Sequence, residues 1–98
     1  MLFFNCCTST TNSVPPMAHT VEIKDMKFQP QELWLNSGDT VVFINRDMVA
    51  HDVTEKNKAW ASPPLLTGQS WRKVITESTD YYCSIHTVMK GKLSVRVQ

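Results

Sequence analysis

The stretch Thr40-Val41-Val42-Phe43-Ile44, made of β-branched and aromatic residues, decides the class of fold. Such side chains favour extended backbone, and an unbroken apolar run of this length predicts a strand that is covered on both faces. The C-terminal stretch alternates instead. Every second residue there is expected on one face of a strand: Gly91, Leu93, Val95 and Val97.

Shorter patterned runs lie between these two stretches. We expect further strands around Val21–Ile23, Leu33–Leu35, His51–Thr54, Trp71–Ile75 and Asp80–Cys83. Turn signals such as Gln29-Pro30 and Asn36-Ser37-Gly38-Asp39 separate them. Several short strands at this spacing, with no helical stripe and no internal repeat, predict a β-sandwich or a barrel. Four aromatic residues are expected in its core or half-buried against it: Phe28, Trp34, Phe43 and Trp71.

Length and charge exclude several classes of function. The 98 residues suffice for one small domain. Ten Lys and Arg against nine Asp and Glu leave a net charge of +1, too small to capture nucleic acid by charge. No apolar run approaches the ~20 residues of a membrane-spanning helix. We interpret the cationic residues as solvated surface, with steering of an acidic partner as the alternative. They include Lys56, Lys58, Arg72, Lys73, Lys90 and Lys92.

The N-terminal part of the chain differs from the rest. It carries no Asp, Glu, Lys or Arg before Glu22, and a polar run leads into Val14-Pro15-Pro16. We therefore expect a flexible leader or linker over residues 1–18, as a remnant of a secretory signal or of an added tail, and one domain over residues 19–98. Cys6 and Cys7 lie in this leader and are given no function.

Cys83 is the only cysteine of the patterned region, which indicates a ligand or a nucleophile rather than a disulfide. Cys83, His86 and Met89 follow one another at three-residue steps, and His51 lies 32 residues before Cys83. Each of these residues alone has an ordinary structural role. One thiolate, two imidazoles and a weak thioether together form the ligand set of a blue copper electron-transfer site.

Other metals fit this set less well. Zinc more often recruits a second Cys, a third His or a carboxylate, and an iron–sulfur cluster needs more cysteines. Two rival functions stay open at this point, a copper trafficking or storage site and a zinc site that only stabilises the fold. Enzyme catalysis is the least favoured, because a closed four-ligand site leaves no position for a substrate.

On these motifs the chain resembles the cupredoxins, most of all the amicyanins, with plastocyanin and pseudoazurin as relatives. The resemblance runs from His19 to Gln98. It rests on Met26–Leu33, Ser37–Val41, Phe43–Val53, Tyr82–His86 and Met89–Leu93. It implies an all-β Greek-key β-sandwich that holds one copper ion. The implied copper ligands are His51, Cys83, His86 and Met89.

The resemblance also implies a function and a setting. The protein would be a soluble, monomeric one-electron carrier that cycles between Cu(I) and Cu(II) in the periplasm or an equivalent space outside the cytoplasm. Its partners would be redox proteins such as a c-type cytochrome or a dehydrogenase, docking near His86. An apolar rim is expected there, built from Met48, Pro63, Pro64, Ile85 and Val88, and Tyr82 resembles a residue that forms a second electron exit in plastocyanin.

Asp52 departs from the resemblance, because this position is commonly Asn in the family. The family pattern implies that its backbone N–H points at the cysteine sulfur. The carboxylate is expected to accept a hydrogen bond from Ser84. A second anion beside the thiolate favours oxidised copper, so we expect a lower reduction potential than an Asn would give.

Overall fold

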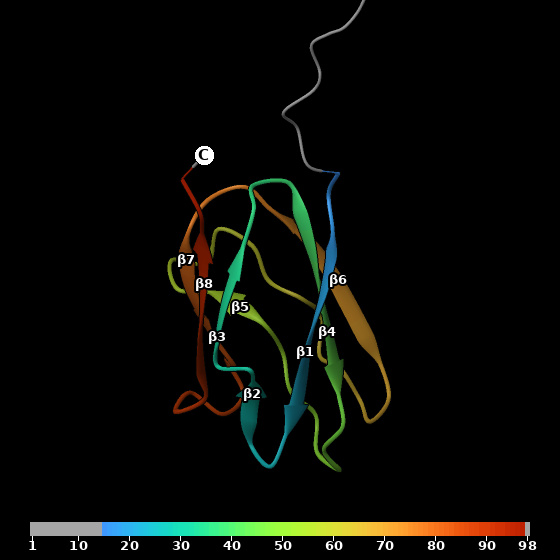
Figure 1. Cartoon of the computed structure of the whole chain (residues 1–98). Helices are drawn as coiled ribbons and strands as arrows, with labels where there is room; N and C mark the ends of the chain where they lie inside the picture. Colours follow the sequence, from blue (N-terminus) through green and yellow to red (C-terminus); the bar gives the residue numbers. More distant parts are fainter. Residues whose placement is uncertain (1–14, 98) are drawn as a thin grey trace, which may run out of the picture.

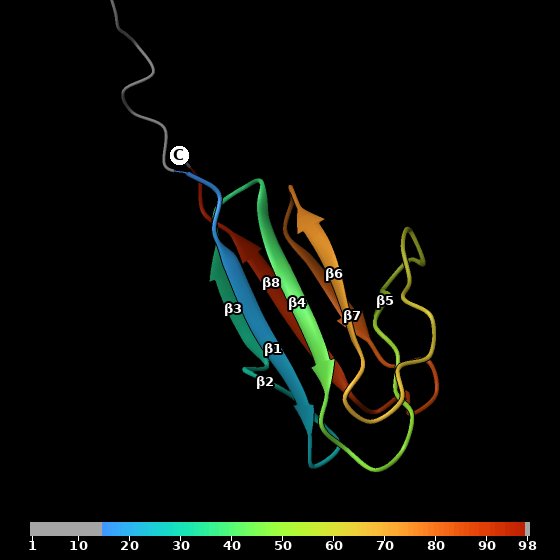
Figure 2. The same cartoon turned by 90° about the vertical axis from the view of Figure 1, so that its right-hand side faces the viewer.

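The computed structural model describes residues 15–97, which form a sandwich of two four-stranded sheets (Figures 1 and 2). No helix occurs in this part of the chain, so the predicted all-β sandwich is confirmed. One sheet has the strand order β2-β1-β4-β6 and the other β3-β8-β7-β5. The strands are β1 (Ala18–Lys24), β2 (Lys27–Gln29), β3 (Glu32–Leu35), β4 (Asp39–Asn45), β5 (Thr54–Glu55), β6 (Ser70–Ile75), β7 (Thr79–Tyr82) and β8 (Lys90–Val95).

Strand direction brings the predicted ligands to one end of the sandwich. β4 runs parallel to β1 and antiparallel to β6 in the first sheet. In the second sheet β7 runs antiparallel to β8, which is parallel to β3. Both β4 and β7 therefore finish at the lower end in Figure 1, where the segments that follow them carry His51 and Cys83.

The core lies between the sheets and is filled by alternate residues of each strand. Val21 and Ile23 of β1 and Val41 and Phe43 of β4 are buried from one side, and Leu93 of β8 from the other. Near its centre, Tyr81 of β7 packs edge-on against Phe28 and Phe43, with ring centroids 4.7 and 5.3 Å away. Apolar residues that alternate along the sequence of a strand therefore point into the core, and the residues between them point to the surface.

Some sequence-based expectations were wrong in detail. Trp34 is 54% exposed because it points outward from the edge strand β3, whereas Leu35 points inward. Val97 is 99% exposed because β8 already ends at Val95. The outward face of β4 is only half-buried, since no third layer covers this sheet within residues 15–97. Around His51 the chain makes a single bridge with Leu65, and the strand begins only at Thr54.

The carboxylate of Asp39 holds the start of the domain, at the end of β4 that lies away from His51. Asp39 accepts hydrogen bonds from the backbone N–H groups of Met17 and Asn36, each at 3.0 Å. It also contacts His19, with 2.8 Å between Nε2 and Oδ2. Most of the predicted leader, including Cys6 and Cys7, lies outside the described residues, and β1 begins at Ala18.

Candidate metal centre

Three of the four predicted ligands meet at the lower end of the sandwich. His51 and Cys83 are fully buried, and His86 is half-buried. One donor atom from each residue lies within 4.8 Å of the other two. His51 Nδ1 is 3.7 Å from Cys83 Sγ, and the two imidazole rings have centroids 5.0 Å apart. The donor atoms of two imidazoles and one thiol therefore lie close together at this end of the sandwich.

The segment between Cys83 and Met89 is closed by its own backbone. The Cys83 N–H donates to the Met89 carbonyl at 3.1 Å, and the Met89 N–H donates to the His86 carbonyl at 3.0 Å. Met89 is 3% exposed. These bonds hold the fourth predicted ligand at the buried end of the loop, directly before β8.

Asp47 orients the ring of His51 and was missed in the sequence analysis. Its Oδ2 accepts a hydrogen bond from His51 Nε2 at 2.8 Å. A proton on Nε2 leaves the lone pair of Nδ1 directed at the Cys83 side, which is the tautomer that a metal ligand requires. The available signal was an acidic residue four positions before a histidine, but that spacing alone is common.

Asp47 is itself held in place by the hairpin between β1 and β2. It accepts backbone N–H bonds from Asp25 at 2.7 Å and Met26 at 2.9 Å. Both of those residues have positive φ angles, 55° and 60°, the left-handed conformation of a tight two-residue hairpin. Burial alone would raise the pKa of Asp47, but the bonds from Met26, His51 and Asp25 outweigh it and lower the pKa below its ordinary value.

Asn45 builds the turn that carries His51. Its amide nitrogen donates to the carbonyls of Val49 and Leu65, each at 2.8 Å, and its amide oxygen accepts from the Asp47 N–H at 2.9 Å. The side chain is fully buried, so these bonds are shielded from water. Asn45 thus supports the site, although no role in it was predicted from the sequence.

Asp52 ties the two ligand segments together, as expected. Its backbone N–H points at Cys83 Sγ at 3.4 Å. Its carboxylate accepts the Ser84 N–H at 2.7 Å, and the Ser84 hydroxyl donates to the other carboxylate oxygen. The Thr54 hydroxyl donates to Oδ1 at 3.2 Å. Asp52 is 7% exposed, so an acidic side chain is mostly shielded from water next to the residue that follows Cys83.

The donor set fits a metal ion. His86 Nδ1 is buried and finds no hydrogen-bond partner among residues 15–97. A buried imidazole nitrogen without a partner is costly unless something binds it. Here it lies close to a thiol and a second oriented imidazole, and soft sulfur with imidazole nitrogen is a set that copper and zinc prefer.

The residues expected in an apolar rim near His86 are exposed. Met48 and Val88 are 90% and 87% exposed. Pro63, Pro64 and Ile85, which the sequence analysis placed in the same rim, are exposed as well. Two further apolar residues are exposed nearby. Val49 lies two residues before His51, and Leu66 follows Leu65, the bridge partner of His51.

Comparison with known proteins agrees with this geometry. Residues 15–96 match the family model of copper binding proteins, plastocyanin/azurin family. The chain is 34% identical to amicyanin of Paracoccus denitrificans over 85 residues, which cover 80% of this chain and 65% of that protein. It therefore spans slightly less than two thirds of this relative's length.

Solved structures show the same similarity. An amicyanin variant in its Cu(I) state superposes with a TM-score of 0.75 at 31% identity, covering 81% of this chain and 82% of that one. A copper-containing nitrite reductase from Thermus scotoductus superposes with a TM-score of 0.77 at 28% identity. That match covers 88% of this chain but only 24% of the reductase. The chain thus belongs to the plastocyanin/azurin family of copper-binding proteins, resembles the amicyanins within it, and takes one copper ion as its cofactor.

Proposed function

We propose that this protein carries single electrons between redox proteins, with copper held by His51, Cys83, His86 and Met89. The observation that supports this most is the convergence of two imidazole nitrogens and one thiol within 4.8 Å, with His86 Nδ1 left unpartnered among the described residues. When bound, copper supplies a one-electron Cu(I)/Cu(II) couple. A thiolate, two imidazoles and an axial thioether are the ligands of electron-transfer copper sites.

The protein's part is to hold this ligand set still. Asp47 fixes the ring of His51, and Asp52 fixes the start of the loop that carries the other three ligands. Because hydrogen bonds brace both segments, the ligands move little when an electron arrives or leaves. Small movement favours outer-sphere transfer, in which no bond to the partner is made.

We propose that partners dock on the apolar rim around His86. A modest apolar surface with few charges suits a brief encounter between redox proteins, and a c-type cytochrome or a dehydrogenase is the expected kind of partner. We place this carrier outside the cytoplasm as a monomer. Within residues 15–97, no helix is long and apolar enough to cross a membrane.

Val88→Asp tests the docking rim. A buried carboxylate in the encounter complex is unfavourable, so we expect electron transfer with the partner to slow about tenfold while copper binding is unchanged. Stopped-flow kinetics with a c-type cytochrome and the copper spectrum provide the two readouts. Unaltered transfer rates would place the docking surface elsewhere.

Addition of copper(II) to the reduced apoprotein tests the function itself. Charge transfer from the Cys83 thiolate to copper(II) is expected to give an intense visible colour at one ion per chain. Cys83→Ser is expected to remain pale. A wild-type protein that binds only Cu(I) and stays colourless would indicate trafficking or storage, and preference for zinc would indicate a stabilising site.

A further inference from the structure

The metal centre is closed on most sides, so copper needs a way in. His51 and Cys83 are fully buried and Met89 is 3% exposed, whereas His86 is half-buried. A metal site built from such side chains requires an entry path, along which the ion exchanges its earlier ligands for these ones. The surface at this end of the sandwich is therefore where the ion first meets the protein.

Two exposed methionines lie beside the carboxylate that holds His51. Met48 directly follows Asp47, whose side chain accepts the hydrogen bond from the His51 ring. Met26 donates its backbone N–H to the same carboxylate at 2.9 Å. Met48 is 90% exposed and Met26 is 42% exposed. Both residues thus offer thioether side chains to solvent close to the support of a predicted ligand.

Packing explains neither methionine. Met48 buries almost none of its surface, so it does not fill a gap in the core. Met26 has a φ angle of 60°, a left-handed conformation for which a two-residue hairpin usually selects Gly or Asn. A long side chain kept in this conformation costs free energy, which is a reason to look for a function of that side chain.

A groove of about 450 Å³ connects the surface at Met26 with the ligand loop. Its lining includes Met26 and Val88, which are exposed, and Met89, which is buried. An outer methionine and a predicted ligand methionine therefore border the same depression.

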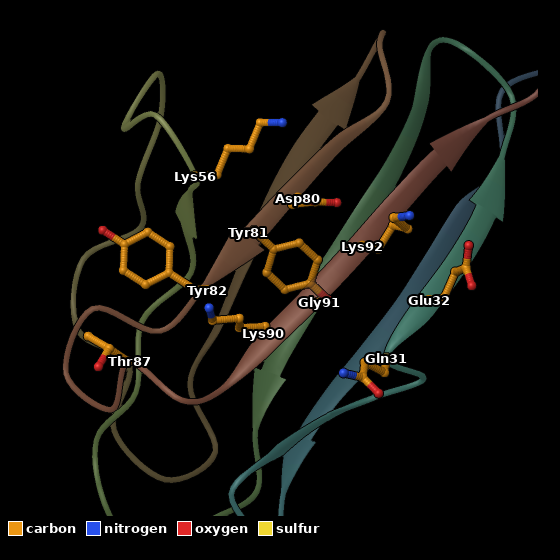
Figure 3. A pocket seen from close by; sticks show the side chains of 10 residues that line it. All are labelled: Gln31, Glu32, Lys56, Asp80, Tyr81, Tyr82, Thr87, Lys90, Gly91 and Lys92. Carbon is orange, nitrogen blue, oxygen red and sulfur yellow. The ribbon is translucent and has the colours of Figure 1, made fainter.

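A neighbouring groove gives a useful contrast. It measures about 650 Å³, lies on the second sheet and shares Gln31 and Lys90 with the first groove (Figure 3). Its lining contains no Met, Cys or His, so it offers copper no sulfur or imidazole donor. Soft donors are thus found along the groove of Met26 and not along the neighbouring one.

We propose that Met26 and Met48 form an entry site that captures Cu(I) and passes it to the metal centre. Thioethers select Cu(I), and they bind it more weakly than a thiolate together with imidazoles, so the ion moves from exchangeable to stronger donors. The oxidation state of copper does not change. The Cys83 thiol releases one proton to solvent as its sulfur binds the ion. The inference rests on the proposed ligand set and adds how the ion reaches it.

Capture at the entry site is tested on protein whose metal centre is already filled. The Cu(I)-loaded protein is titrated with a further equivalent of Cu(I) without oxygen, while methionine methyl resonances are followed by NMR. All proteins carry Cys6→Ser/Cys7→Ser, so that these thiols do not compete for the ion. We expect shifts of the Met26 and Met48 methyls. The Met17 methyl is expected to stay, although Met17 is 56% exposed, because its backbone binds Asp39 at the other end of β4.

The loading rate is tested with Met26→Leu/Met48→Leu, which removes both sulfurs and keeps an apolar surface of similar volume. The apoprotein is mixed with the coloured Cu(I)–bathocuproine disulfonate complex, and the loss of its colour reports loading. We expect loading to slow about tenfold, which corresponds to about 1.4 kcal/mol. The final Cu(I) affinity is expected to stay the same, because all proposed ligands remain.

Two controls separate capture of Cu(I) from other effects. Met17→Leu removes an exposed thioether at the far end of the sandwich, and it is expected to load at the wild-type rate. Loading with hydrated Cu(II) is expected to be equally fast in wild type and Met26→Leu/Met48→Leu, because Cu(II) does not favour thioethers.

Four results would overturn this inference. They are an unchanged Cu(I) loading rate in Met26→Leu/Met48→Leu, equal slowing in Met17→Leu, an altered final affinity in the double variant, and an absence of shifts at both Met26 and Met48. A wild-type protein that shows no colour with Cu(II) would instead overturn the proposed function. Capture of Cu(I) is measured without that colour, so the two failures are distinguishable.

Discussion

Two histidine–aspartate pairs lie near opposite ends of β4, and they have the same geometry but different consequences. At the lower end His51 Nε2 is 2.8 Å from Asp47 Oδ2, and at the upper end His19 Nε2 is 2.8 Å from Asp39 Oδ2. The His51 side chain is fully buried, whereas that of His19 is 20% exposed. The pair by itself therefore does not distinguish a functional site from a structural one.

The difference lies in what surrounds each pair. The second nitrogen of His51 faces Cys83 Sγ, and the ring of His51 contacts that of His86. Asp39 instead gathers the backbone of Met17 and Asn36, and so fastens the beginning of β1 to the turn before β4. One carboxylate thus orients a ligand, and the other holds a strand in place.

The largest expected contrast comes from removing each histidine. His51→Ala deletes a strong ligand, so the intense copper colour is expected to be lost completely. His19→Ala is expected to keep the colour at full intensity, because its ring lies near the far end of β4. Copper(II) titrations followed by visible absorption give the readout. A coloured His51→Ala protein would contradict the proposed ligand set.

A smaller contrast comes from neutralising each aspartate. Asp47→Asn weakens the bond that fixes the His51 tautomer, and loss of such a partner typically lowers metal affinity about 10–100-fold. Asp39→Asn is expected to leave affinity unchanged. Competition with a chelator of known copper affinity measures both. Equal affinities in the two variants would show that Asp47 does not position the ligand.

Acid stability is expected to depend on Asp39. The pKa of Asp39 is lowered from 3.8 to about 2 by its bond from His19 and then by the N–H groups of Met17 and Asn36. A carboxyl whose pKa is lower when folded contributes stability above its ordinary pKa and loses it as the pH falls. The wild-type apoprotein is therefore expected to lose stability between about pH 4 and pH 2.

Asp39→Asn is expected to flatten this pH dependence and to lower Tm at neutral pH by roughly 5 °C or more. Thermal unfolding of the apoprotein followed by circular dichroism is the measurement, because acid would also protonate the metal ligands. A slope between pH 4 and pH 2 that persists unchanged in the variant would assign the acid sensitivity to other carboxyls.

The smallest expected effect concerns Asp52. Its carboxylate accepts the N–H of Ser84, the residue after Cys83. An anion near the thiolate is expected to favour oxidised copper, so Asp52→Asn is expected to raise the reduction potential modestly. Voltammetry of the wild type and the variant measures it, with Glu77→Gln as a control that removes an exposed carboxylate on the β6–β7 turn. An unchanged or lowered potential in Asp52→Asn would refute this role.

The sequence predicted the four ligands and the link from Asp52 to the loop of Cys83, but it did not predict how the ring of His51 is held. Cys83, His86 and Met89 lie in one loop, and a recurrent motif predicts their common role with His51. The role of Asp47 depends on a turn and a neighbouring hairpin that bring its carboxylate back to His51. Spacing along the chain does not encode that contact.

The same limit applies to the surface. Alternation predicted which side Leu33 and Leu35 face, but not that the opposite side of β3 is open, which leaves Trp34 exposed. Strand register likewise places Lys90 of β8 opposite Tyr82 of β7. The sequence analysis interpreted Lys90 as solvated surface, with steering of an acidic partner as the alternative.

X-ray absorption at the copper edge tests the central claim most directly, because it reports the atoms bound to the ion in the loaded protein. We predict one short bond to sulfur and two to imidazole nitrogen, with the short sulfur contribution abolished in Cys83→Ser. A copper ion surrounded only by nitrogen and oxygen, or one whose spectrum is the same in Cys83→Ser, would contradict the account.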